Sequence, residues 1–134
     1  MSRGIICLLI DDDMDEFEIF SIALQQVDKS AVCIYASDGT MAIEKLMDPT
    51  FTPHLIFVDM NMPKMNGIQC LREIRKIERL TNTPVYMYST SSNQNLIEES
   101  RQSGAVQYIV KPVSIYDTEK TLAEILSGLQ TVNS

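Results

Sequence analysis

Three consecutive aspartates, Asp11 to Asp13, directly follow an apolar run that begins at Ile5. A strand that is covered on both faces of a sheet has such a continuous apolar sequence, so the aspartates are expected at its carboxyl end. Ligands of open α/β sheets bind at that end of the strands. Clustered carboxylates repel one another unless a cation compensates their charge. The pattern fits a divalent metal site and, equally well, a solvated turn that caps the next helix.

Polar side chains also follow three other apolar segments. Asp59 comes directly after residues 55–58, Ser89 begins a hydroxyl-rich stretch that includes Thr90, and Lys111 ends the last strand-like segment. Strand ends of a doubly wound sheet share one edge, so these groups are expected in a single crevice with the aspartates. Oxygen ligands suit Mg²⁺, whereas a hydroxyl and a lysine suit the oxygens of a phosphoryl group. A carboxylate held there can act as the nucleophile and form an aspartyl-phosphate.

The apolar segments alternate between two periodicities along the chain. Strand-like runs lie at 5–10, 32–36, 55–58, 84–88 and 105–110. Helices are predicted at 17–27, 41–47, 68–77, 93–103 and 122–129, of which 93–103 is the least apolar and ends before Gly104. Strands that alternate with helices predict a parallel sheet with right-handed crossovers and helices on both faces. The predicted class is therefore α/β.

Composition limits the partners and the compartment. The 134 residues fit one domain, and their net charge of −7 argues against non-specific binding to nucleic acid or to an anionic membrane surface. The apolar runs are shorter than the roughly 20 residues that span a bilayer, and the N-terminus becomes acidic too soon for a signal peptide. The number of cysteines is odd and none form a CxxC pair, which favours free thiols. The single histidine, His54, argues against a His-rich zinc site. We therefore expect a cytoplasmic protein without nucleic-acid or membrane partners.

Four motifs together resemble the receiver domain of two-component response regulators, in particular the single-domain chemotaxis type. They are LLIDDD, LIFVDMNMPKMNG, PVYMYSTS and GAVQYIVKPV, in that order, and they cover nearly the whole chain. The resemblance implies a flavodoxin-like, doubly wound (βα)5 fold with a five-stranded parallel sheet in the order 2-1-3-4-5. We expect residues 1–134 to form a single receiver domain without an output domain.

The resemblance assigns roles to the acidic residues. Asp59 would be the phosphoacceptor, which attacks the phosphorus of a phosphohistidine on a partner protein. Asp12 would ligate Mg²⁺ or Mn²⁺ directly together with Asp59, and Asp11 would do so directly or through a water. The backbone carbonyl of Asn61 would complete the protein ligands. Asp13 is interpreted as a helix cap or a surface charge.

The resemblance also assigns roles at the last two strands. Ser89 would donate a hydrogen bond to a phosphoryl oxygen, and Lys111 would pair with another. Strand periodicity does not distinguish Ser89 from Thr90, and the family spacing from Lys111 favours Ser89. A cis peptide bond before Pro112 would aim the lysine. Tyr108 stands at the aromatic switch position and would turn inward when Ser89 moves to the phosphate.

The expected function is that of a stand-alone signalling module rather than an enzyme. Its phosphoryl group would come from a sensor histidine kinase or a histidine phosphotransfer protein. Its output would be a target protein bound at the face of the fourth helix, fifth strand and last helix, or passage of the phosphoryl group along a relay, and dimerisation through that face is left open. The alternatives are a Mg²⁺-dependent phosphatase of the haloacid-dehalogenase type, a flavin-binding module and a receiver-like module that binds partners without phosphorylation. The sequence Asp59-Met60-Asn61 lacks the second acid of the phosphatase motif.

Overall fold

The computed structural model describes residues 4–133, without the side chains of 130–133. The strands are β1 (Ile6–Ile10), β2 (Val32–Ala36), β3 (Leu55–Asp59), β4 (Val85–Ser89) and β5 (Gln107–Val110). The helices are α1 (Met14–Val27), α2 (Gly39–Met47), α3 (Gly67–Arg75), α4 (Gln94–Gln102) and α5 (Ile115–Asn133), with a short 3-10 helix, η1 (Glu78–Leu80). All strand pairs are parallel, and the order is β2-β1-β3-β4-β5. The predicted α/β class and strand order are confirmed.

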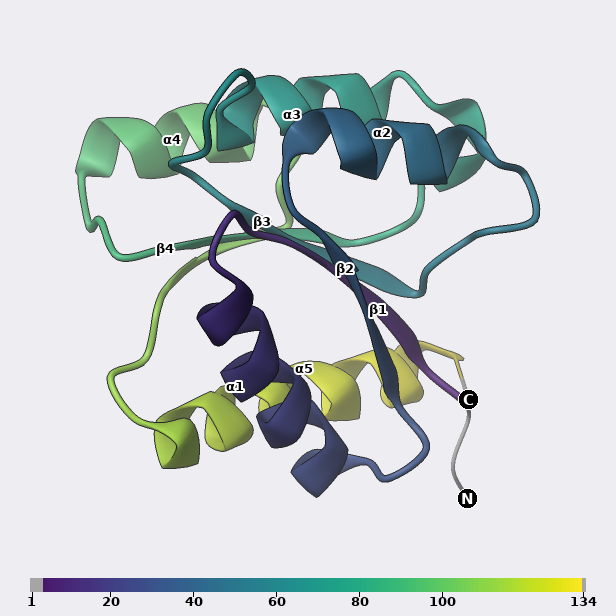
Figure 1. Cartoon of the computed structure of the whole chain (residues 1–134), viewed down its shortest axis with the longest axis vertical. Coiled ribbons are helices and arrows are strands. Elements are labelled where there is room, and N and C mark those ends of the chain that lie inside the picture. Colours follow the sequence, from purple (N-terminus) through teal and green to yellow (C-terminus); the bar gives the residue numbers. More distant parts are fainter. Residues whose placement is uncertain (1–3, 134) are drawn as a thin grey trace.

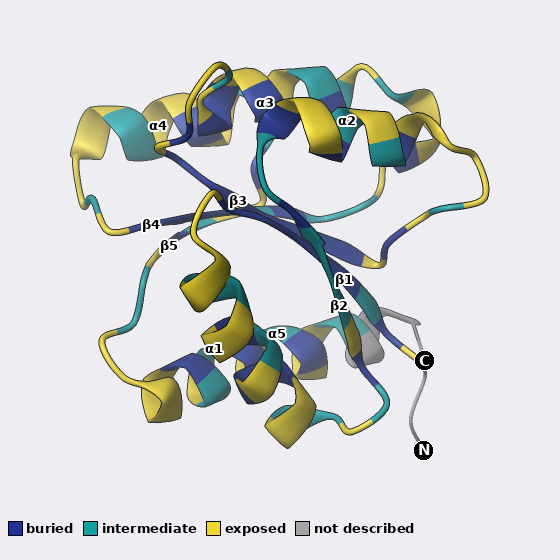
Figure 2. Cartoon of the chain, viewed as in Figure 1, coloured by how far each residue is buried: buried dark blue, intermediate teal, exposed yellow. Residues whose placement is uncertain are grey.

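The sheet separates two apolar cores, because side chains of a strand alternate between its faces. Leu8 and Ile10 of β1 pack on the side that α2, α3 and α4 cover. Cys7 and Leu9 pack on the opposite side, which α1 and α5 cover (Figure 1). Figure 2 shows β3 buried along its length, which explains the uninterrupted apolar sequence that precedes Asp59.

Short polar side chains begin several of the helices. Asp38 caps α2 by accepting from the backbone N–H of Met41, and Asn93 caps α4 by accepting from Asn95 and Leu96. Such a residue satisfies N–H groups that have no partner within the helix. Because each of these helices follows a strand, its cap also fixes the direction in which the chain leaves the edge of the sheet.

The last helix starts earlier than its apolar pattern predicts. The apolar spacing begins at Leu122, whereas α5 begins at Ile115. Ser114 explains the difference: its hydroxyl accepts from the backbone N–H of Asp117, and its carbonyl accepts from Thr118. The first turns of α5 are largely exposed, so helical apolar spacing is absent there even though the backbone is helical.

Candidate functional site

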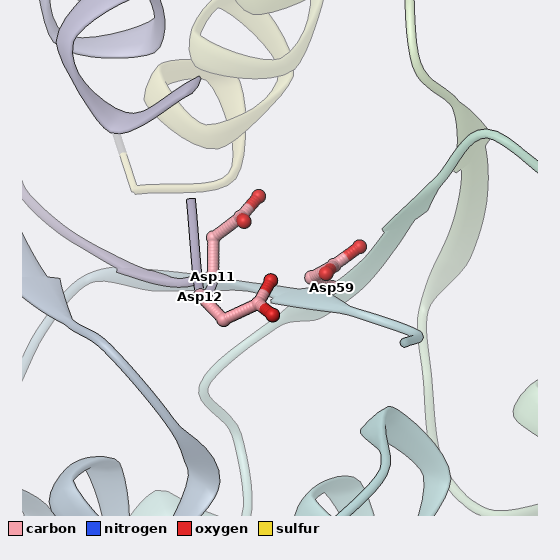
Figure 3. A group of neighbouring side chains, drawn as sticks. All are labelled: Asp11, Asp12 and Asp59. Atoms are coloured by element: carbon pink, nitrogen blue, oxygen red, sulfur yellow. The ribbon is translucent and has the colours of Figure 1, made fainter. Parts of the chain in front are cut away.

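The carboxyl ends of β1 and β3 bring three aspartates together (Figure 3). Asp11 and Asp12 follow β1, Asp59 ends β3, and one carboxylate oxygen from each residue lies within 4.8 Å of the other two. Asp11 and Asp59 are buried, whereas Asp12 is exposed. Carboxylate oxygens grouped in this way are the donors that Mg²⁺ and Mn²⁺ take from proteins. The donor set therefore fits a hard divalent cation.

Lys111 reaches the same group from the end of β5. Its backbone N–H donates to the carbonyl of Ser89 at 2.7 Å, which holds it beside β4. Its Nζ lies 3.1 Å from Oδ1 of Asp59 and 3.2 Å from Oδ2 of Asp11, and it also contacts the Glu16 carboxylate. The residues that sequence predicted at three strand ends thus meet at one edge of the sheet.

Burial and charge act against each other on these groups. Burial raises the pKa of Asp59, although the nearby Lys111 ammonium lowers it in part. Burial also raises the pKa of Asp11 to about 7, and its hydrogen bond with the Glu16 carboxyl adds to this effect. Burial disfavours the charged form of Lys111, but pairing with Glu16, Asp11 and Asp59 raises its pKa above the ordinary value. The site holds more carboxylates than its lysine compensates.

This imbalance predicts a pH dependence of stability in the metal-free protein. The pKa of Asp11 is about 7 in the folded state and about 4 in the unfolded state, so the folded protein binds this proton more tightly. The free energy of unfolding contributed by Asp11 is therefore largest below pH ~4 and falls as pH rises to ~7, by on the order of 4 kcal/mol. Urea unfolding with a chelator between these pH values measures the fall. It should be smaller in Asp11→Asn, and equal slopes for both proteins would contradict the prediction.

Ser89 and Tyr108 are joined through one intervening residue. Ser89 is fully buried at the end of β4, whereas Thr90 is exposed. The Ser89 hydroxyl accepts from the N–H of Ser91 at 3.1 Å, and the Tyr108 hydroxyl donates to the carbonyl of Ser91 at 2.8 Å. Ser89 is thus the buried residue of the two and the last residue of β4. The two bonds tether the loop after β4 to β5.

A family model described as the response regulator receiver domain matches residues 7–123. The chain belongs to this family. Receiver domains are modules of two-component signalling, they interact with histidine kinases and phosphotransfer proteins, and they generally bind Mg²⁺ in an acidic pocket. Within the described residues of this receiver, none of the helices has the length and apolarity that crossing a membrane requires.

Individual relatives agree with this assignment. Chemotaxis protein CheY of Pseudomonas aeruginosa is 36% identical over 90 residues, which are 67% of this chain and 71% of CheY. Autoinducer 2 sensor kinase/phosphatase LuxQ of Vibrio vulnificus is 34% identical over 111 residues, which are 83% of this chain and 12% of LuxQ. The crystal structure of the Mn²⁺-bound form of response regulator Rcp1 has a TM-score of 0.74 at 27% identity and covers 91% of each chain.

One expectation about the receiver site is wrong. Pro112 follows a trans peptide bond, not the cis bond that the resemblance implied. An X–Pro bond favours trans by about 0.5–1 kcal/mol unless the surrounding fold locks the other isomer. Lys111 contacts both Asp59 and Asp11 with the trans bond, so the lysine needs no such kink to reach the site.

Asp13 and the loop after β3 have structural roles in the receiver. Asp13 is the N-cap of α1 and accepts from the N–H of Asp15 at 2.9 Å, which confirms its interpretation as a cap.

Asn61 is exposed at the start of the loop between β3 and α3. The N–H of Gly67 donates to the carbonyl of Met60 at 2.8 Å and closes this loop. The backbone of Asn61 is thereby held next to Asp59.

Glu16 is the charged residue of the site that the sequence pattern did not identify. It lies in the first turn of α1, three residues after the Asp13 cap, where a glutamate ordinarily reaches back to the cap. In this receiver its carboxylate contacts Nζ of Lys111 instead. The position of Glu16 therefore predicts a capping role. Its ion pair with Lys111 could not be predicted, because the two residues lie far apart in the sequence.

Proposed function

We propose that Asp59 accepts a phosphoryl group from a phosphohistidine on a sensor kinase or a phosphotransfer protein. The observation that carries this proposal is the position of Lys111, whose Nζ lies 3.1 Å from Asp59, a member of the carboxylate group that also includes Asp11 and Asp12. This arrangement offers a nucleophile, a cation for the transferring oxygens and a set of metal donors.

The proposed transfer needs few groups. An oxygen of the Asp59 carboxylate forms a bond to phosphorus, the phosphorus–nitrogen bond of the phosphohistidine breaks, and the electron pair leaves with the imidazole nitrogen. Lys111 and the Ser89 hydroxyl bind oxygens of the transferred group. Asp11, Asp12 and Asp59 would hold Mg²⁺ or Mn²⁺ together with the backbone carbonyl of Asn61. When bound, the ion would neutralise part of the phosphoryl charge. The Mn²⁺-bound form of the related Rcp1 supports this ion class.

The two hydrogen bonds at Ser91 support a pathway by which a phosphoryl group at Asp59 would change the surface of the protein. Movement of the Ser89 hydroxyl towards a phosphoryl oxygen removes the acceptor of the Ser91 N–H and displaces the carbonyl that Tyr108 binds. Tyr108 would then be free to turn inward, with an effect on the face formed by α4, β5 and α5. We propose that this face binds the downstream target, with dimerisation or relay of the phosphoryl group as further outcomes.

Large exposed apolar side chains beside the site support docking of the phosphoryl donor there. Ile19 of α1 is half exposed. Val113, between β5 and α5, and Tyr116, in the first turn of α5, are exposed to a greater degree. Together with Lys111, Ile19 and Val113 line a cavity of about 360 Å³ at the mouth of the site. A partner that buries these side chains would bring its histidine close to Asp59.

We further propose a stand-alone cytoplasmic receiver whose chemistry is limited to its own phosphorylation and slow hydrolysis. The 71% coverage of the length of CheY supports the stand-alone form, whereas in LuxQ the matched residues are a small part of a long protein.

Metal removal tests the proposed function directly. With acetyl phosphate and Mg²⁺, the intact mass of the protein should increase by one phosphoryl group, because neutralised charge lets the anionic donor approach Asp59. Excess EDTA should abolish the increase, and restored Mg²⁺ should recover it. A protein that stays unmodified with both donor and Mg²⁺, while a known receiver is modified in parallel, would overturn the proposal.

A further inference from the structure

Lys111 is shared among three carboxylates that differ in their surroundings. Asp11 and Asp59 are buried and lie 3.2 and 3.1 Å from its Nζ, whereas the Glu16 side chain is 36% exposed and lies on α1. An ammonium has three N–H donors, so these acceptors can occupy all of them. We propose that Glu16 is a positioning residue that holds Lys111 in the site and competes with the phosphoryl group for its ammonium.

The competition follows from where the charges lie. Asp11, Asp12 and Asp59 form the group that fits a divalent cation, and Glu16 lies outside that group. A cation bound to the three aspartates repels the Lys111 ammonium and takes over two of its acceptors. Glu16 is then the carboxylate that keeps the ammonium beside the site.

The same ion pair weakens the interaction of Lys111 with a phosphoryl oxygen. While the Glu16 carboxylate on α1 binds the Lys111 ammonium, the ammonium interacts less strongly with the phosphoryl oxygen. Glu16 also adds a negative charge near an anionic group. This part of the inference rests on the proposed role of Asp59. Removing the Glu16 charge should therefore affect cation and anion binding in opposite directions.

The test compares Glu16→Gln with the wild type in two titrations. Mg²⁺ alone is titrated first, and beryllofluoride, a stand-in for the phosphoryl group, is then titrated at saturating Mg²⁺. Intrinsic tyrosine fluorescence is a suitable readout, because the ring of one of the five tyrosines, Tyr88, lies 5.6 Å from Nζ of Lys111. Glu16→Gln should weaken Mg²⁺ binding about five-fold and strengthen beryllofluoride binding about five-fold, each equivalent to ~1 kcal/mol. Glu16→Asp should restore values nearer the wild type.

Two controls separate positioning from general electrostatics. Asp15→Asn removes the same charge from the neighbouring, exposed residue of α1 and should change neither affinity. In a Lys111→Gln background, Glu16→Gln should have a clearly smaller effect, because the part that passes through the lysine is lost and only the hydrogen bond of Glu16 with Asp11 remains. Equal shifts in Asp15→Asn, undiminished shifts without Lys111, or unchanged affinities in Glu16→Gln would each overturn the proposal. Failure of the wild type to bind beryllofluoride would instead contradict the role of Asp59, while the Mg²⁺ titration still decides the role of Glu16.

Discussion

Asp59→Asn is expected to abolish the Mg²⁺-dependent gain of a phosphoryl group. Asparagine keeps the size and shape of the side chain but replaces the nucleophilic carboxylate with a neutral amide. Lys111 and the other acids stay in place, so the loss would be attributable to the nucleophile. Intact mass after incubation with acetyl phosphate and Mg²⁺ gives the answer, with the modified fraction falling to background.

The matched control is Asp13→Asn. Asp13 is in the same acidic sequence but caps α1, and asparagine is an equally good N-cap, so the helix should be retained. This variant should gain the phosphoryl group as the wild type does. If Asp59→Asn still gained it, peptide mapping would locate another acceptor and the assignment of Asp59 would be wrong.

Gly67→Ala is expected to lower the free energy of unfolding by about 3 kcal/mol. A Cβ atom at this position would lie 2.5 Å from the carbonyl oxygen of Asp59 and 2.8 Å from the Cα of Met60. Both neighbours are backbone atoms of Asp59, the proposed phosphoacceptor, and of the residue after it, and they cannot rotate away. The strand end or the start of α3 must therefore move, which should reduce phosphorylation as well. Urea denaturation measures the first effect, and intact mass after acetyl phosphate treatment measures the second.

Gly128→Ala is the corresponding control for glycine replacement in a helix. Nothing lies within 4 Å of a Cβ at position 128 in α5. Alanine has a helix propensity about 1 kcal/mol better than glycine, so this variant should be slightly more stable than the wild type. A Gly67→Ala protein as stable as Gly128→Ala would show that the backbone around Asp59 relaxes without penalty.

Much of the fold could be predicted from sequence because its signals are local. The uninterrupted apolar segment before Asp59 marked a central strand, and the predicted boundaries of β2 agree with the structure. The start of α5 could not be predicted in this way, since its first turns are largely exposed and Ser114 is a weak signal by itself. The 3-10 helix η1 likewise has too few residues to show a periodicity.

The residues of the site likewise differ in whether a local sequence signal predicts their position. Asp11, Asp59 and Lys111 could be placed together because each ends a strand, and parallel strands share an edge. Glu16 lies on a helix, and its pairing depends on how α1 is oriented over the sheet, which its apolar spacing does not specify. The peptide isomer at Pro112 depends on the tertiary surroundings rather than on the dipeptide.

The ion pair between Lys111 and Asp11 joins residues that are 100 positions apart. During synthesis, the aspartates that gather at the sheet edge leave the ribosome long before their lysine does. A nascent chain that has already paired β1 with β3 holds those carboxylates without Lys111, so dissolved Mg²⁺ would stabilise the partly made sheet. Arrival of β5 then supplies the chain's own counter-charge.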